Sequence, residues 1–151
     1  MNLSLISQKP SSPTTLGVLA ALRAASEESD YVTEVRVAQP QQWQPSKDEA
    51  AILLLEEEGA AWPAPLWPAG GSALGLPVLP LLVHRQYEHT PQGPDVRDPH
   101  FYFVSNGILL DEAELADPAC SLVLQSKFES YFPLLSRLIL LRQRQPGVLS
   151  S

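Results

Sequence analysis

Proline restricts what this chain can fold into more than any other residue type does. The chain has 151 residues and 15 prolines, about twice the usual share. Eight of the prolines lie within residues 61–99. Because a proline inside a helix removes a hydrogen bond and clashes with the preceding turn, no helix of useful length fits there. We therefore predict a long proline-rich loop over residues 61–99, with one edge strand over residues 81–87 directly after Pro80.

Two tryptophans and a leucine lie between these prolines, at Trp62, Leu66 and Trp67. Disordered linkers are normally poor in aromatic residues, whereas tryptophan is enriched at the energetic centres of protein interfaces. The segment therefore has two interpretations that the sequence does not separate. It is either a protein-binding loop or a loop whose indoles fold back and cover the core.

Other prolines mark the starts of predicted helices. Ser12 before Pro13 is typical of an N-cap followed by the first helical residue. Apolar residues at three-to-four spacing follow, so we predict a helix over residues 14–25.

The C-terminal part of the chain predicts further helix. Asp117 before Pro118 repeats the N-cap and proline pattern, and it predicts a helix over residues 118–130. A second helical stretch is expected over residues 133–145. Pro133 either kinks one long helix or starts a second one.

Three stretches predict strands. Residues 31–37 alternate with period two, as a half-buried strand does. Residues 50–55 are a continuous apolar run, which suits a buried strand or a short buried helix; its shortness favours the strand. Residues 100–110 contain Asn106 and Gly107 between two apolar runs, which predicts a β-hairpin with a tight turn at its tip.

Together these elements predict an α+β fold. We expect one compact domain over residues 14–146, with a mixed or mainly antiparallel sheet and the N-terminal and C-terminal helices packed on one face. A small α/β sandwich with a central parallel pair of strands is the alternative. Residues 1–13 are expected to be a flexible lead-in and residues 147–151 a tail.

Composition and missing motifs exclude several functions. Seventeen acidic residues against ten Lys and Arg give a net charge of −7, which argues against a general nucleic-acid binder. The sequence has no GxGxxG, GxxxxGK[ST], SxxK or HExxH motif, so we expect no cofactor.

Cys120 is the single cysteine, which excludes an intrachain disulfide. Its place beside a helix start would lower the thiol pKa, although a buried apolar role is favoured.

No membrane or export segment is expected. The first ten residues lack a basic stretch followed by an apolar run. The longest strongly apolar stretch, residues 75–83, is far shorter than the roughly 20 residues of a membrane span. We therefore predict a cytoplasmic protein.

Histidines and acids supply an alternative function. His84, Glu88 and His100, together with residues 56–58 (Glu56, Glu57, Glu58), would serve a small motif-free enzyme or a metal-binding protein if they lay together. The favoured interpretation is that the histidines are partly exposed and the acids keep a strand end in water.

Basic residues near the C-terminus supply a weaker alternative. Lys127, Arg137, Arg142 and Arg144 outnumber Glu129 in the last predicted helices. This excess would suit contact with nucleic acid, but arginines are also common at helix C-termini because they complement the helix dipole.

The leading hypothesis is a non-enzymatic protein-interaction protein: a small acidic subunit, assembly factor, adaptor or chaperone. The last helix has more apolar residues than one amphipathic face needs, which suggests a dimer or a partner groove. The expected partner is another protein, with a second copy of the chain as one possibility. The predicted interface residues are Trp62, Leu66, Trp67, Leu134, Leu138 and Leu141.

Overall fold

The computed structural model describes residues 1–55, 75–84, 101–104 and 108–144. The strands are β1 (Asn2–Ser7), β2 (Glu34–Ala38), β3 (Glu49–Leu55), β4 (Leu76–His84), β5 (Phe101–Phe103) and β6 (Ile108–Asp111). The helices are α1 (Pro13–Glu27) and α2 (Pro118–Arg144), with short 3₁₀ turns η1 (Pro40–Gln42) and η3 (Glu112–Ala116). The predicted mixture of helices and strands is confirmed.

The strands form one sheet in the order β2-β1-β3-β4-β5, with β6 also paired to β4. Every pair is parallel, so the prediction of a mainly antiparallel sheet is wrong. Leu5 in β1 lies between Val37 of β2 and Ile52 of β3. The connections explain the difference, because α1 and other long segments separate strands that a tight turn would have paired antiparallel.

The predicted hairpin is also wrong. β5 pairs with Leu76–Val78 of β4, and β6 pairs with Leu81–His84 of the same strand. The two short strands therefore follow one another along one edge of β4 and run in the same direction. Asn106 and Gly107 lie outside the described residues. Long-range pairing with β4 has overridden the local hairpin signal of this stretch.

The predicted edge strand after Pro80 is instead the interior strand β4, which pairs with β3 on one side and with β5 and β6 on the other. The Val104 amide donates to the Val78 carbonyl, so even-numbered residues of β4 direct their main-chain groups towards β5 and β6. Pro80 shares this direction and faces the interval between those strands. Pro77 faces β3 before the pairing with β3 begins at Val78. Each proline thus lies where its missing N–H breaks no ladder.

The expectation of a flexible lead-in over residues 1–13 is wrong for its first part, which is the strand β1 in the interior of the sheet. Leu3, Leu5 and Ile6 are buried. Two of its inward-facing residues are serines, Ser4 and Ser7, and they hide the apolar pattern of a central strand.

Other predictions agree with the structure. α1 begins at Pro13 with Ser12 as its N-cap, and the Ser12 side chain accepts a hydrogen bond from the Thr15 amide. β3 is a strand that is buried along its whole length. β2 begins three residues later than predicted and is half-buried. α2 is one continuous helix with Pro133 inside it, so this proline does not start a second helix.

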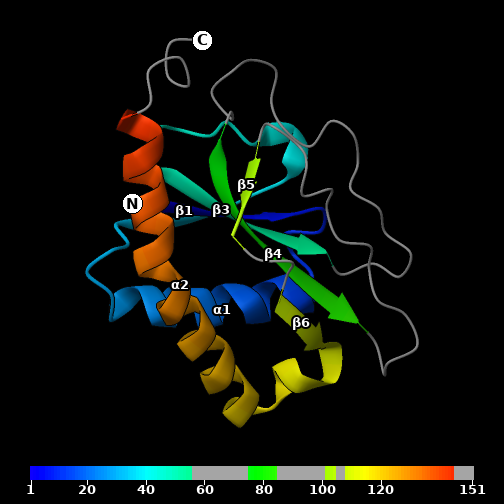
Figure 1. Ribbon diagram of the computed structural model, residues 1–151. Coiled ribbons are helices and arrows are strands. Elements are labelled where there is room, and N and C mark those ends of the chain that lie inside the picture. The colour runs from blue at the N-terminus through cyan, green and yellow to red at the C-terminus, as the bar shows by residue number, and fades with distance from the viewer. Residues whose placement is uncertain (56–74, 85–100, 105–107, 145–151) are drawn as a thin grey trace.

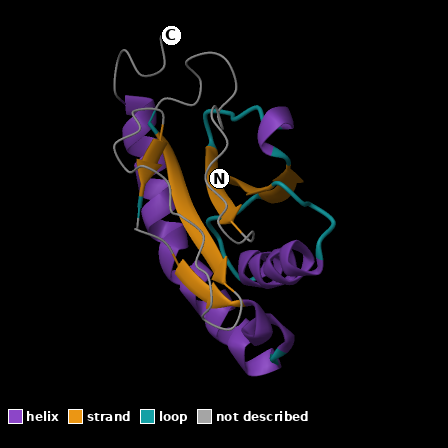
Figure 2. Ribbon diagram, turned by 90° about the vertical axis from the view of Figure 1, so that its right-hand side faces the viewer, coloured by secondary structure: helices purple, strands orange, loops and turns teal. Residues whose placement is uncertain are grey.

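Both described α-helices pack on one face of the sheet. Val18 and Leu22 of α1 and Phe128 and Phe132 of α2 share a core cluster with Ile52 of β3. The two helices cross and contact each other (Figure 1). A turned view shows the long α2 along one side of the sheet and α1 near its lower end (Figure 2).

The other face of the sheet has a separate core cluster to which neither α1 nor α2 contributes. Trp43, which follows η1, packs there with Ile6 and Leu53. This arrangement follows from the connection between β2 and β3, which passes on the side opposite α1, as two right-handed crossovers in opposite directions require.

Candidate functional site

The strand order reverses at β1. From β1 the chain runs through α1 to β2 on one side, and from β2 it returns to β3 on the other side. In open parallel sheets ligands bind at such a switch point, in the crevice outside the carboxyl ends of the strands. The loop that joins Ser7 to Pro13 is therefore the place where this fold most often holds a ligand.

Hydroxyl groups of this loop bond to one another. Thr15 Oγ1 donates to the Lys9 carbonyl at 2.8 Å, and it accepts from Ser12 Oγ at 3.0 Å. Ser7 Oγ lies 2.9 Å from Thr15 Oγ1. Because the Thr15 proton already goes to Lys9, Ser7 must donate in that contact. Ser7 and Thr15 are fully buried, so the network belongs to the interior of the protein.

Main-chain amides of the loop are also largely used. Lys9 donates its amide to Ser7 Oγ, and Ser12 donates to the Lys9 carbonyl. The Thr15 amide donates to Ser12 Oγ. Pro10 and Pro13 have no amide hydrogen to offer.

These bonds change what the switch point can do. A phosphate-binding loop uses glycines so that free backbone amides surround the anion at the helix N-terminus. Here serines and prolines replace the glycines, and Ser12 caps α1 from within the chain. An anion that used the amides of Lys9, Ser12 and Thr15 would have to displace these bonds, so the hydroxyl network stabilises the loop in a closed conformation.

The outer face of α2 is apolar in a way that its packing does not require. Leu134 and Leu141 are 42% and 44% exposed, Leu138 is half-buried, and Val123 is 55% exposed. The opposite face of the same helix is anchored in the core by Phe128, Phe132, Leu135 and Ile139. The structure therefore places three predicted interface residues, Leu134, Leu138 and Leu141, on or beside one exposed stripe.

Most of the other predicted site residues lie outside the described part of the chain: Trp62, Leu66, Trp67, Glu56, Glu57, Glu58, Glu88 and His100. The backbone of His84 is described as the last residue of β4, opposite Asp111 of β6. Whether the histidines and acids come together stays a prediction.

The basic residues of α2 do not act as one group. Arg142 is only 4% exposed, and its guanidinium lies 3.5 Å from the Ser46 carbonyl. Burial lowers the pKa of Arg142, while the charge of Glu49 acts in the opposite direction. Lys127, Arg137 and Arg144 are exposed, and these three remain available on the surface.

Glu49 is a buried carboxylate on the face of the sheet opposite α1 and α2, and the sequence does not predict it as a site residue. Glu49 Oε1 accepts from Ser4 Oγ at 2.8 Å, and Glu49 Oε2 accepts from Trp43 Nε1 at 2.9 Å. Glu49 and Trp43 are both 2% exposed. This trio ties the β2–β3 connection to the start of β3, which is a structural role. No motif or spacing in the sequence signals it.

Cys120 differs from both of its predicted states. The residue is half-exposed, and its thiol donates to Asp117 Oδ2 at 3.8 Å. Partial desolvation, with the charges of Asp117 and Glu114, raises the pKa of the Cys120 thiol. The thiol pKa is therefore shifted in the direction opposite to the predicted lowering, because desolvation and then the neighbouring acids oppose the helix N-terminus.

An open depression of about 330 Å³ lies between the start of β1 and α2, with Asn2, Asp48 and Gln143 among its lining residues. The Gln143 side-chain amide already donates to Asp48 and to the Lys47 carbonyl. The hydrogen bonds of Gln143 therefore link α2 to the β2–β3 connection.

Comparison with protein-family models, with curated proteins and with solved structures finds no match to this chain. Within the described residues, no three His, Cys, Asp or Glu side chains gather as a metal site would require. Over the same residues, no helix combines the length and apolar character needed to cross a bilayer.

Proposed function

We propose that the protein is a non-enzymatic interaction protein, such as a small acidic subunit, assembly factor, adaptor or chaperone. It binds another protein through the outer face of α2. The observation that carries this proposal is the pair of exposed leucines Leu134 and Leu141, with the half-buried Leu138 beside them, on a helix whose opposite face is already anchored in the core.

The energetics of this surface favour binding. Full burial of a leucine side chain stabilises a complex by roughly 1.5–3 kcal/mol. Leu134 and Leu141 keep 42% and 44% of their surface in contact with water, so a partner would gain the corresponding part of this free energy. Because packing against the sheet already holds α2 in place, a partner would not have to order the helix on binding.

The switch-point loop supports the same proposal. A small-molecule function for this topology would use the crevice at the carboxyl ends of β1 and β3. Ser7, Ser12 and Thr15 all use their O–H donors within this network and the loop backbone. We therefore assign function to the surface of α2 and keep Trp62, Leu66 and Trp67 as a second part of the proposed interface.

Affinity purification from the source cell tests the proposal. The arms are the unaltered chain, Leu134→Glu with Leu141→Glu, and Leu16→Glu as a matched control, since Leu16 is a 53% exposed leucine on α1. We expect a protein to co-purify with the unaltered chain and the control and to be lost from the double variant, whose circular dichroism should be unchanged. Retention of every co-purifying protein by the folded double variant would overturn the assignment to α2.

A further inference from the structure

We infer that the outer face of α2 binds a second copy of this chain, with the two α2 helices antiparallel. This inference rests on the proposed function and names the partner of the same surface. Three features carry it: the spacing of the exposed residues, the opposite charges at the two ends of α2, and the contact of η3 with α2.

Seven of the exposed residues of α2 form two series with a spacing of seven, and Leu122 and Leu140 lie exposed beside them. One series is Lys127, Leu134 and Leu141, and the other is Val123, Ser130, Arg137 and Arg144. All seven are exposed. Alternating steps of three and four residues keep these side chains on one face of the helix, as in helices that pair along their length. With 27 residues and a rise of about 1.5 Å per residue, α2 offers a face about 40 Å long.

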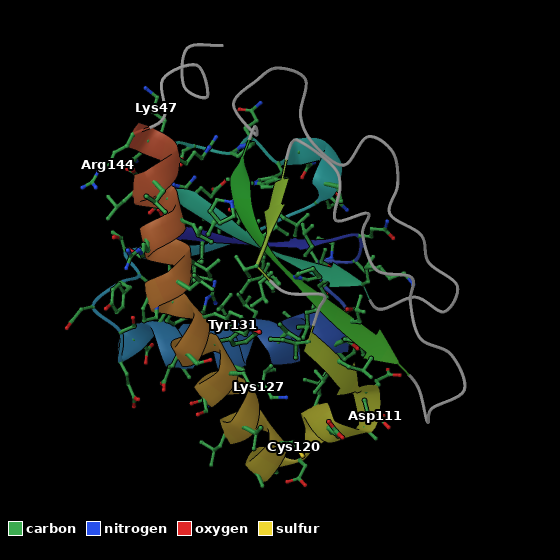
Figure 3. The ribbon with its side chains drawn as sticks, in the orientation of Figure 1. Lys47, Asp111, Cys120, Lys127, Tyr131 and Arg144 are labelled. Carbon is green, nitrogen blue, oxygen red and sulfur yellow. The ribbon has the colours of Figure 1, made fainter. Side chains whose placement is uncertain are left out.

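The charged residues of this face are all cations, Lys127, Arg137 and Arg144, and the acids that could pair with them lie just before the helix. The C-terminal end has Arg137 and Arg144, whereas Glu112, Glu114 and Asp117 precede the N-terminal end. η3, which contains both glutamates, contacts α2 and lies beside its N-terminal end. Figure 3 shows Asp111 and Cys120 near one end of α2 and Arg144 at the other.

The opposite charges at the two ends of α2 favour a second copy of the chain in the antiparallel direction. An antiparallel second copy brings the arginines of each chain to the acids of the other, and two-fold symmetry makes this contact twice. A parallel copy would place arginines beside arginines. An anionic membrane or nucleic acid would match only the basic end and would be repelled by the acidic end.

The seven-residue series sets the register. With the two-fold axis between residues 128 and 129, Val123 of one chain lies opposite Leu134 of the other, and Lys127 lies opposite Ser130. Arg137 then lies opposite Cys120, one turn from Asp117, and Arg144 points towards η3. The register pairs Val123 with Leu134 twice, places Leu141 opposite Ala116 of η3, and brings the arginines of each chain to the acidic end of the other, while the two Lys127 residues flank the two-fold axis about one turn apart.

Light scattering coupled to gel filtration, over a dilution series, tests the association. We expect a concentration-dependent mass approaching about twice 16.5 kDa, a monomer for Leu134→Glu with Leu141→Glu, and no change for Leu16→Glu. Arg137→Glu with Arg144→Glu should weaken the dimer at least tenfold. Adding Glu112→Lys and Glu114→Lys to that variant should restore most of the association.

Cysteine crosslinking tests the direction. Two variants are made in a Cys120→Ser background, one with Val123→Cys and one with Leu134→Cys. Each variant is oxidised alone, and an equal mixture of the two is oxidised as a third sample. An antiparallel pair predicts a disulfide mainly in the mixture, whereas strong crosslinking within each separate sample would indicate parallel helices and overturn the inference.

The two proposals fail in different ways. A chain that stays monomeric at every concentration while the Leu134/Leu141 variant still loses a co-purifying protein would refute the second copy and keep the interface. A dimer that is insensitive to Leu134→Glu with Leu141→Glu would show that the copies meet elsewhere, and it would also refute this inference.

Discussion

Ser7 Oγ and Thr15 Oγ1 lie 2.9 Å apart, and this contact joins the last residue of β1 to the first turn of α1. It lies at the switch point of a parallel sheet, where related topologies hold their ligands. In this chain the position is filled by the hydroxyl groups of the loop itself. The topology of the sheet is thus one in which ligands often bind at this position, but here the loop hydroxyls bond to one another.

The hydroxyl network predicts a stability cost for Thr15→Val. Valine keeps the shape of the side chain but removes the oxygen that bonds Lys9, Ser7 and Ser12. Leaving the buried Ser7 hydroxyl without this acceptor, together with the loss of the part-buried bonds to Lys9 and Ser12, should lower the free energy of unfolding by about 1–3 kcal/mol, as measured by urea denaturation. Ser11→Ala, at an exposed position in the same loop, should change it by less than about 0.5 kcal/mol. Equal effects of the two changes would contradict the account.

The same loop predicts indifference to phosphate ligands. A ligand that binds the folded state raises the melting temperature by mass action. Because the amides of Lys9, Ser12 and Thr15 are already bonded within the loop, titration with Mg²⁺ and ATP, ADP or inorganic phosphate should leave the melting temperature unchanged. A saturable increase that Ser12→Ala alters would show that the loop does open to an anion.

Glu49 predicts a second stability effect on the other face of the sheet. Trp43→Phe removes the indole donor and leaves Glu49 Oε2 without that bond. The unfolding free energy should fall by about 1–3 kcal/mol. Glu34→Gln breaks only the exposed pair with Arg36 at 3.0 Å, which is worth about 0–1 kcal/mol. A larger loss for Glu34→Gln than for Trp43→Phe would contradict the assignment of Glu49 as a buried tie.

Cys120 predicts a pH dependence. Because the folded pKa of its thiol is raised, less reactive thiolate exists at a given pH than in the unfolded chain. Alkylation by iodoacetamide should therefore reach its half-maximal rate at a higher pH in the folded protein than in urea. Asp117→Asn removes one neighbouring charge while keeping an N-cap residue, so it should move the midpoint back down. A folded midpoint below the unfolded one would contradict the geometry around this thiol.

Local signals in the sequence were sufficient for some elements. Ser12 and Pro13 predict the start of α1 because capping depends on neighbouring residues. The short continuous apolar run before Glu56 predicts β3, because its length and composition suit a buried strand. β1 was missed because its parallel partners are remote in sequence and its inward-facing Ser4 and Ser7 break the apolar pattern.

Long-range pairing also explains the other failures. The Asn106–Gly107 signal is local, whereas β5 and β6 are fixed by β4, more than twenty residues earlier. Pro80 suggested an edge, but it lies where neither neighbouring ladder needs its amide. Spacing alone places Leu134 and Leu141 on one face of a helix, whereas the exposure of that face follows from the packing of Phe128 and Phe132 in the core. The Ser7–Thr15 network was not, since its partners come together only after β1 and α1 have formed.

Site-specific photocrosslinking in the source cell tests the central claim, that the outer face of α2 is a protein-binding surface. A photoreactive residue would replace Leu134 in one variant and Leu16 in another, both exposed leucines on different helices. The account predicts a discrete crosslinked product from position 134, with the mass of two chains if the partner is a second copy, and none from position 16. Equal crosslinking from both positions, or none from position 134 in the folded protein, would contradict it.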